Sequence, residues 1–308
     1  INPLKTSYGV SELFLKAIPL ILIATGLSIG FRANVWNIGA EGQFILGAIA
    51  ATGVALHFDD HPRILLLTEM AIAGMLGGMV WAAITAFLKT RFNANEILVS
   101  LMLVYVAQYL ADWFVHGPWK DPDGFGFPQT VIFSENAILP TFFEGLRVNI
   151  SLLGALLFLV IAYFFIFKSF TGFKILVSGY SKAAARYAGF SINGSVWIGL
   201  LAGGAMAGIA GMSEVSGPAN QLTAHISNGY GFAAIIVAYV GRLHPVGIFF
   251  SGLLMALLYL GGEQAQFYLN LPSSIGQIFQ GMLLFFLLGF DILVQYRIRY
   301  TGFMRKEA

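Results

Sequence analysis

A polar stretch between two apolar runs holds the side chains best suited to bind a solute. It reads NVWNIGAEGQFILGAIAATG from Asn34 to Gly53 and contains Asn37, Glu41 and Gln43. Amide and carboxylate groups form directional hydrogen bonds, and the neighbouring Trp36 offers an aromatic face for stacking. These groups predict recognition of a small polar molecule rather than its chemical conversion.

Motifs for covalent, metal-dependent or nucleotide chemistry are absent from the sequence. It contains no GxxxxGK[ST] phosphate loop, no HExxH zinc motif and no cysteine. Four acidic residues, Glu69, Asp112, Glu214 and Glu263, fall near the ends of apolar segments rather than inside them. Proton-coupled transporters usually keep an ionisable relay inside the bundle. We therefore predict no catalytic residue, no metal site and no cofactor on this chain, and expect energy for transport from elsewhere.

The composition indicates an integral membrane protein. Of 308 residues, 57% are hydrophobic and 10% are charged, and the mean hydropathy is +0.77. Long apolar runs predict transmembrane helices, since a helix satisfies its own backbone in lipid. The nine predicted segments lie at 13–31, 44–58, 64–88, 97–115, 148–167, 196–215, 230–241, 246–260 and 275–294. We predict an all-α polytopic fold with one membrane domain over residues 1–308, and a tenth helix upstream of Ile1 in the intact chain.

The basic residues predict how the segments are oriented. Twelve of the 17 Lys and Arg residues fall in one alternating set of loops, which the positive-inside rule assigns to the cytoplasm. The loop at 168–195 and the carboxy terminus belong to this set. The loop at 116–147, rich in Pro, Gly and Asp, is then external, and its composition predicts ordered turns or a short lid.

Two halves of the chain resemble an inverted repeat. With the fifth segment as divider, four segments precede it and four follow in opposite orientation, and the second of each four is short. Short segments at matching positions indicate a transporter site. We predict a pathway lined by Trp36, Asn37, Glu41, Gln43, Asn228, Tyr230 and Phe232. The alternative is a structural role, in which Glu41 pairs with Arg32 and the polar stretch only ties a loop to neighbouring helices.

The basic loop at 168–195 contains the short sequence YSKAAARYAGF. Ser181 suits a helix N-cap, Lys182 to Ala188 are mostly helix formers, and Gly189 suits a left-handed stop, so the sequence predicts about two helical turns. Lys182 and Arg186 share one face, and Tyr187 and Phe190 are aromatic anchors for a groove. The two interpretations are docking to a partner and contact with anionic membrane lipid.

Glycine-rich stretches at 73–83 and 201–211 predict close helix packing. They read AGMLGGMVWAA and LAGGAMAGIAG. Helices associate in lipid through packing, and small residues let two backbones approach closely. We expect this structural role rather than a ligand site.

Several stretches together resemble the permease subunits of bacterial ABC importers for nucleosides and simple sugars. They occur in order and read FRANVWNIGAEGQFILGA, NANEILVSLMLVYVAQYL, HGPWKDP with GFPQT, GYSKAAARYAGF, AGGAMAGIAGMSEV and NGYGFAAIIVAYVGRLHPVG. The resemblance implies ten helices per permease, an ATP-binding partner subunit that carries ATP and Mg, an external substrate-binding protein, a second related permease and location in the inner membrane.

The resemblance also implies that residues 179–189 form the helix that couples to the ATPase. The matching positions are Ala184, Ala185, Arg186, Tyr187, Ala188 and Gly189, while Ser181 and Lys182 replace the usual Asn-Pro. Serine preserves the cap and the missing proline removes some preorganisation. The stretch Asn37 to Gln43 matches the hallmark of the family without change.

We therefore predict the permease subunit of an ATP-driven importer, with no nucleic-acid partner. The alternative is a secondary transporter or channel for a small polar solute that works without an ATPase. The sequence leaves open whether the solute is a nucleoside, a base or a sugar.

Overall fold

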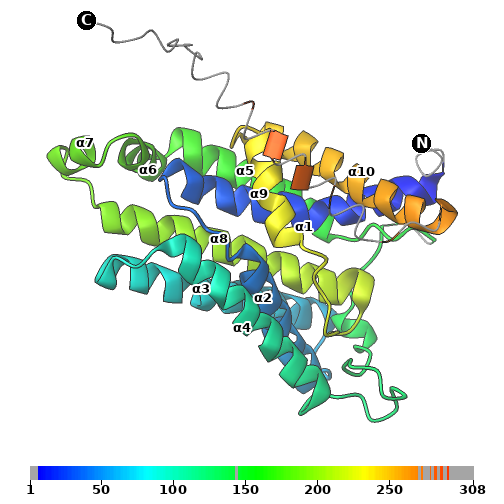
Figure 1. Cartoon of the computed structure of the whole chain (residues 1–308). Helices are drawn as coiled ribbons and strands as arrows, with labels where there is room; N and C mark the ends of the chain where they lie inside the picture. The colour runs from blue at the N-terminus through cyan, green and yellow to red at the C-terminus, as the bar shows by residue number, and fades with distance from the viewer. Residues whose placement is uncertain are drawn as a thin grey trace, which may run out of the picture. The chain divides into compact units, whose positions relative to one another are not determined.

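The computed structural model describes residues 6–142 and 145–269, together with seven isolated residues between 272 and 290. The chain divides into two units, residues 1–260 and 261–308. The described elements are α1 (Ser7–Arg32), α2 (Ala40–His57), α3 (Arg63–Phe92), α4 (Glu96–His116), the short 3-10 helix η2 (Glu135–Ala137), α5 (Ser151–Lys168), α6 (Phe170–Tyr180), α7 (Lys182–Tyr187), α8 (Ile192–Glu214), the π-helix η3 (Val215–Ala219), α9 (Tyr230–Val240) and α10 (Pro245–Leu269) (Figure 1).

Each of the first eight predicted apolar segments lies on a helix. Six helices are long and apolar enough to cross a membrane: α1, α3, α4, α5, α8 with its π-helical extension, and α10. α9 is shorter, and α2 has 18 residues with a polar start. The ninth segment, at 275–294, lies outside the continuously described residues. Among the described residues the regular secondary structure is helical, with two isolated β-bridges, and the protein is a multi-pass membrane protein.

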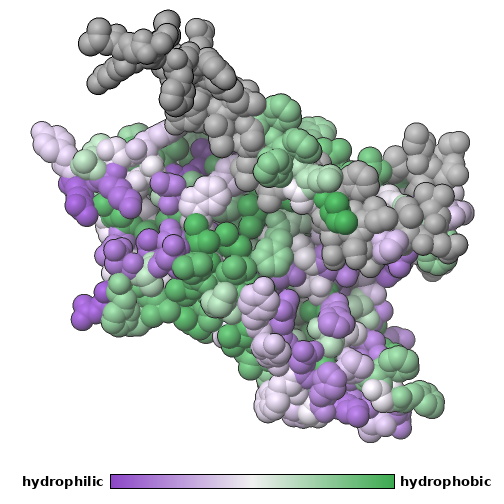
Figure 2. All heavy atoms as spheres, viewed as in Figure 1, coloured by the Kyte–Doolittle hydropathy of each residue, from purple (hydrophilic) through white to green (hydrophobic). Residues whose placement is uncertain are grey.

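α8 lies at the centre of the main helix packing of the first unit. This helix contacts α1, α2 and α3, and α2 also packs on α3. α1 is apolar around its whole circumference and is buried for most of its length, as expected for a central helix. α3, α4 and α5 instead expose most of their apolar side chains. Figure 2 shows hydrophobic side chains gathered over the middle of the visible face and hydrophilic side chains towards its two ends, as membrane insertion requires.

Glycines form the contact between α3 and α8, which confirms the predicted close packing. A Cβ atom on Gly78 would clash with the carbonyl oxygen of Gly204, and one on Gly208 would clash with that of Gly74. Gly47 on α2 approaches Gly208 equally closely. The backbones of α2, α3 and α8 therefore approach one another so closely that only glycine fits at these positions.

The described residues of the loop at 116–147 form turns, as predicted, and they are hydrogen-bonded to the chain that follows α8. Backbone N–H groups of Thr130, Phe133 and Leu139 donate to carbonyl oxygens of Leu222, Asn220 and Ser216 at 3.0, 2.9 and 2.8 Å. The described part of the loop consists of turns, η2 and isolated bridges. This pairing holds the loop against the end of α8 and its π-helix.

The loop at 168–195 contains two helices, and only the second was expected. α7 confirms the predicted short helix, with Ser181 as its N-cap. α6 was missed because its apolar residues form a run too short to cross a membrane and are interrupted by Lys174. α6 is positioned by a close approach to α1, where a Cβ on Gly179 would clash with the carbonyl oxygen of Arg32.

Candidate functional site

The polar start of α2 is held together by an amide pair. Nδ2 of Asn37 donates to Oε1 of Gln43 at 2.9 Å, and Nε2 of Gln43 donates to Oδ1 of Asn37 at 3.1 Å. The same Oδ1 accepts from the backbone N–H of Gly39, the N-cap residue, which has no side chain for this task. Both amide side chains are buried, so their mutual bonds compensate for the loss of water.

Glu41 joins the start of α2 to the start of α9. Its Oε2 atom accepts from the backbone N–H of Gly231 at 2.6 Å. The N-cap of α9 is Gly229, with φ +80° and no capping side chain. A carboxylate at a helix N-terminus satisfies free N–H groups and is favoured by the helix dipole. Glu41 therefore caps α9 from another helix, and its side chain is buried.

The pairing of Glu41 with Arg32, considered as the alternative to a pathway role, does not occur. Nη2 of Arg32 donates to the carbonyl oxygen of Leu243 at 3.0 Å, and its guanidinium lies 4.9 Å from the ring centroid of Phe167. Arg32 thus ties α1 to the turn between α9 and α10. The broader alternative was that Glu41 and Gln43 tie the polar stretch to neighbouring elements. The contacts of both side chains in this structure agree with it.

The aromatic residues predicted for the pathway belong to two groups. Tyr230 is buried and packs against Phe44 and Tyr259, with ring centroids at 6.1 and 5.6 Å. Trp36 stacks on Tyr239, with ring centroids 5.4 Å apart and 17° between the ring planes.

Trp36 and Phe232 form no ring contact in the part of the chain that the structure describes. Tyr239 is seven residues after Phe232 on α9, a separation of about 10 Å along a helix. Phe232 is partly exposed, and Asn228 participates through its backbone carbonyl, which accepts from the Tyr259 hydroxyl at 3.1 Å. Of the seven predicted residues, the structure brings together Asn37 with Gln43, and Glu41 with the start of α9 beside Tyr230.

The second candidate surface is α7. Oγ of Ser181 accepts from the backbone N–H of Ala184 at 3.2 Å, and Gly189 has φ +73°, so the predicted cap and left-handed stop are both confirmed. Ala184 is exposed and Ala185 is buried. The side chain of Tyr187 is 97% exposed.

Phe190 does not act as an exposed anchor. Its ring packs edge-on against Phe170 and Phe173, with centroids at 5.9 and 6.2 Å. Nζ of Lys174 lies 4.5 Å from the centroid of Phe170 and 5.8 Å from that of Phe190. Phe190 therefore fastens the end of the α7 segment to α6, and Tyr187 is the aromatic side chain that α7 presents.

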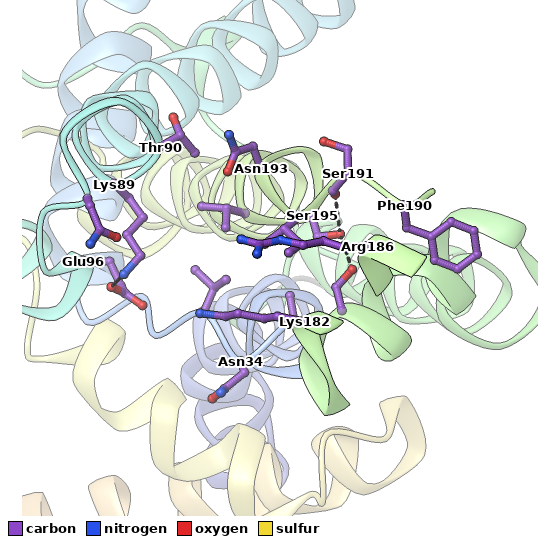
Figure 3. A pocket seen from close by; sticks show the side chains of 16 residues that line it. Asn34, Lys89, Thr90, Glu96, Lys182, Arg186, Phe190, Ser191, Asn193 and Ser195 are labelled. Atoms are coloured by element: carbon purple, nitrogen blue, oxygen red, sulfur yellow. Dashed lines mark hydrogen bonds and ion pairs between the residues drawn. The ribbon is translucent and has the colours of Figure 1, made fainter. Parts of the chain in front are cut away.

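A polar pocket of about 380 Å³ lies between α7, the turn from α3 to α4 and the start of α8 (Figure 3). Its lining side chains include Asn34, Lys89, Thr90, Asn93, Glu96, Lys182, Arg186, Ser191, Asn193 and Ser195. Nζ of Lys89 and Oε2 of Glu96 form an ion pair at 2.6 Å. The sequence analysis did not predict that residues 89–96 and the loop at 168–195 meet in one pocket.

The chain matches known permease proteins along most of its length. The family described as "Branched-chain amino acid transport system / permease component" matches residues 9–288. A glucose ABC transporter permease protein, TsgB13 of Haloferax volcanii, is 34% identical over 97% of this chain and 80% of its own length. The guanosine ABC transporter permease protein NupP of Bacillus subtilis is 29% identical over 98% of this chain and 86% of its own length.

A third relative is the nucleoside ABC transporter permease protein NupB of Lactococcus lactis, 28% identical over 93% of this chain and 81% of its own length. The family match runs from the first turn of α1 through the end of α10. This protein belongs to the branched-chain amino acid transport system permease component family.

Proposed function

We propose that this chain is the permease subunit of an ATP-driven importer for nucleosides or related small solutes, including sugars. Similar chains are named as guanosine, nucleoside and glucose permeases, so the solute class is a small molecule rich in hydroxyl groups. The ATP-binding subunit is a separate chain that carries ATP and Mg. An external substrate-binding protein and a second, related permease complete the proposed assembly.

The observation that carries this proposal is the exposed, capped helix α7. It is only six residues long, too short to be stable alone in water, yet it presents Arg186 and Tyr187 to the surroundings. We propose that α7 docks on the ATP-binding subunit through Lys182, Ala184, Arg186 and Tyr187. Ser181, Ala185 and Gly189 would set its position and ends, so that closure of the ATPase moves α7 and the helices attached to it.

The proposed solute pathway runs past the junction of α2 and α9. In the proposed inverted repeat of nine segments, these two helices occupy matching positions. Their starts are joined by the bond between Glu41 and Gly231. The residues proposed to line the pathway are Trp36, Asn37, Glu41, Gln43, Asn228, Tyr230 and Phe232. Because Asn37, Glu41, Gln43 and Tyr230 are buried here, contact of these four side chains with solute requires the junction to open in another state of the transport cycle.

The proposed orientation follows from the loop charges. One transmembrane domain over residues 1–308 crosses the inner membrane, with α7 and the carboxy terminus in the cytoplasm. The loop at 116–147 lies outside, where its exposed Phe125 and Phe127 are available to the substrate-binding protein.

Reconstituted uptake tests the proposed function. Liposomes that contain the permease pair and its ATP-binding subunit should accumulate labelled guanosine or glucose. They should do so only with binding protein outside and ATP inside. The control is an ATP-binding subunit with its phosphate-loop lysine replaced, which should abolish uptake. Uptake by the permease alone, driven by an ion gradient, would instead support the secondary-transporter alternative.

A further inference from the structure

The pocket beside α7 carries an uncompensated positive charge. Lys89 and Glu96 neutralise each other at 2.6 Å, whereas Lys182 and Arg186 form no ion pair or hydrogen bond in the part of the chain that the structure describes. Glu96 is the sole acidic residue in the lining. Figure 3 shows the side chains of Lys182 and Arg186 reaching from α7 towards Lys89 and Glu96. The balance of three cations and one carboxylate favours an anionic ligand.

The remaining lining groups suit an oxyanion with a polar organic portion. Ser191 caps the 23-residue helix α8, and its Oγ atom accepts from the backbone N–H of Gly194 at 3.0 Å, so its hydroxyl hydrogen is free to donate elsewhere. The positive end of the α8 dipole therefore also faces this region. Amide groups of Asn93 and Asn193 add neutral donors and acceptors.

Charge and geometry favour phosphate over carboxylate. A phosphate monoester carries between one and two negative charges near neutral pH, which matches two free cations. The planar guanidinium of Arg186 can bind two phosphate oxygens at once, while Lys182 supplies a point charge. A volume of about 380 Å³ exceeds what a phosphate group alone fills, and therefore leaves room for an attached organic group.

We propose that this pocket binds the phosphate group of a phosphate monoester or of an anionic lipid. Lys182 and Arg186 hold the phosphate, and Asn193 contacts the group attached to it. A ligand held this way links α7 to the start of α8. It would thereby restrict the surface that the proposed function assigns to the ATP-binding subunit. The binding itself does not depend on that function, because every group involved belongs to this chain.

Binding to the full chain without partner subunits provides the test. The protein in nanodiscs of zwitterionic phosphatidylcholine is titrated calorimetrically with ribose 5-phosphate, with inorganic phosphate and with uncharged ribose at 150 mM salt. In parallel, nanodiscs that also contain phosphatidylglycerol are used for native mass spectrometry of retained lipid. Saturable binding of ribose 5-phosphate identifies a soluble ester as the ligand. Selective retention of phosphatidylglycerol, together with a lower affinity for the ester, identifies a lipid as the ligand.

Two double variants separate the pocket from general electrostatics. Lys182→Gln with Arg186→Gln should weaken binding by about tenfold or more, because charge-assisted hydrogen bonds are lost. Lys168→Gln with Arg91→Gln removes the same charges from exposed positions outside the pocket and should change affinity by less than about twofold. Asn193→Ala should weaken binding of ribose 5-phosphate more than that of inorganic phosphate.

The proposal is overturned if neither the ester nor the anionic lipid binds, or if both double variants weaken binding equally. Misfolding does not confound the comparison, since Lys182 and Arg186 are exposed and make no bonds within the described chain. Failure of uptake in the reconstituted importer would leave this binding result unaffected.

Discussion

The carboxylate of Glu41 accepts a hydrogen bond from the backbone N–H of Gly231 at 2.6 Å, across 190 residues of sequence. The bond joins the first turns of α2 and α9, neither of which has a capping side chain at its own N-cap. A Cβ on Gly231 would clash with the backbone of Glu41. The two helix starts are therefore held in direct contact by one carboxylate and one glycine.

Replacing Glu41 should destabilise the protein. Glu41→Ala leaves buried N–H groups at the start of α9 without a partner and should cost about 1–3 kcal/mol, whereas Glu41→Gln keeps an acceptor and should cost less. Thermal unfolding of the purified protein in detergent measures both. Glu135→Ala, at the start of the short helix η2, is the control and should leave stability nearly unchanged. Equal stability of Glu41→Ala and the unaltered protein would show that Glu41 does not hold the junction.

The amide pair of Asn37 and Gln43 should behave as one unit. Each single substitution to alanine leaves one buried amide unsatisfied, so the double substitution should cost less than the sum of the singles, with a coupling energy of about 1 kcal/mol. A double-mutant cycle by thermal unfolding gives this value. Additive effects would mean that the two amides act independently.

Solute transport distinguishes a pathway from a purely structural role. Gln43→Ala and Tyr230→Ala should reduce uptake or alter the preference among nucleosides and sugars, while the complex still assembles. The measurement is competitive uptake in liposomes, with assembly checked by size-exclusion chromatography. Loss of assembly with unchanged solute preference among surviving complexes would assign both residues to structure alone.

The face of α7 should be essential for coupling. Ala184→Asp with Arg186→Glu places carboxylates on the exposed face proposed to dock, and should abolish transport and reduce copurification of the ATP-binding subunit. Lys168→Glu changes charge in the same loop away from α7 and should have little effect. Full transport and undiminished copurification in the double variant would contradict the docking proposal.

Thiol labelling tests the orientation. Phe125→Cys and Tyr187→Cys use side chains that are 99% and 97% exposed in a chain without cysteine. A membrane-impermeant reagent on intact cells, or on spheroplasts where an outer membrane is present, should label the first alone, and the reverse pattern would invert the topology.

The glycine crossing should tolerate no side chain. Gly78→Ala forces α3 away from α8, because the new methyl group meets the carbonyl oxygen of Gly204, and should cost about 1–3 kcal/mol or prevent folding. Gly154→Ala on α5 is the matched control, since a Cβ there meets no atom within 4 Å. Equal yields and melting temperatures for the two variants would contradict the packing.

The amino-acid sequence alone determined the features that depend on local composition. Apolar runs of sufficient length predicted the helices, because a backbone in lipid must form its hydrogen bonds within the protein. The cap and stop of α7 were predictable from Ser181 and Gly189, since both act within one or two helical turns. The glycine stretches predicted close packing because backbone approach depends on side-chain size alone.

Only the tertiary structure decided which polar groups meet. Glu41 could bond Arg32, nine residues away, but it bonds Gly231, because the packing of α2 and α9 offers free N–H groups at a helix start. Phe190 is covered by α6, a helix too short to stand out in the hydropathy pattern. The pocket of Lys182 and Arg186 arises where α7 faces the turn from α3 to α4. Such contacts join residues far apart in the chain, so no local pattern encodes them.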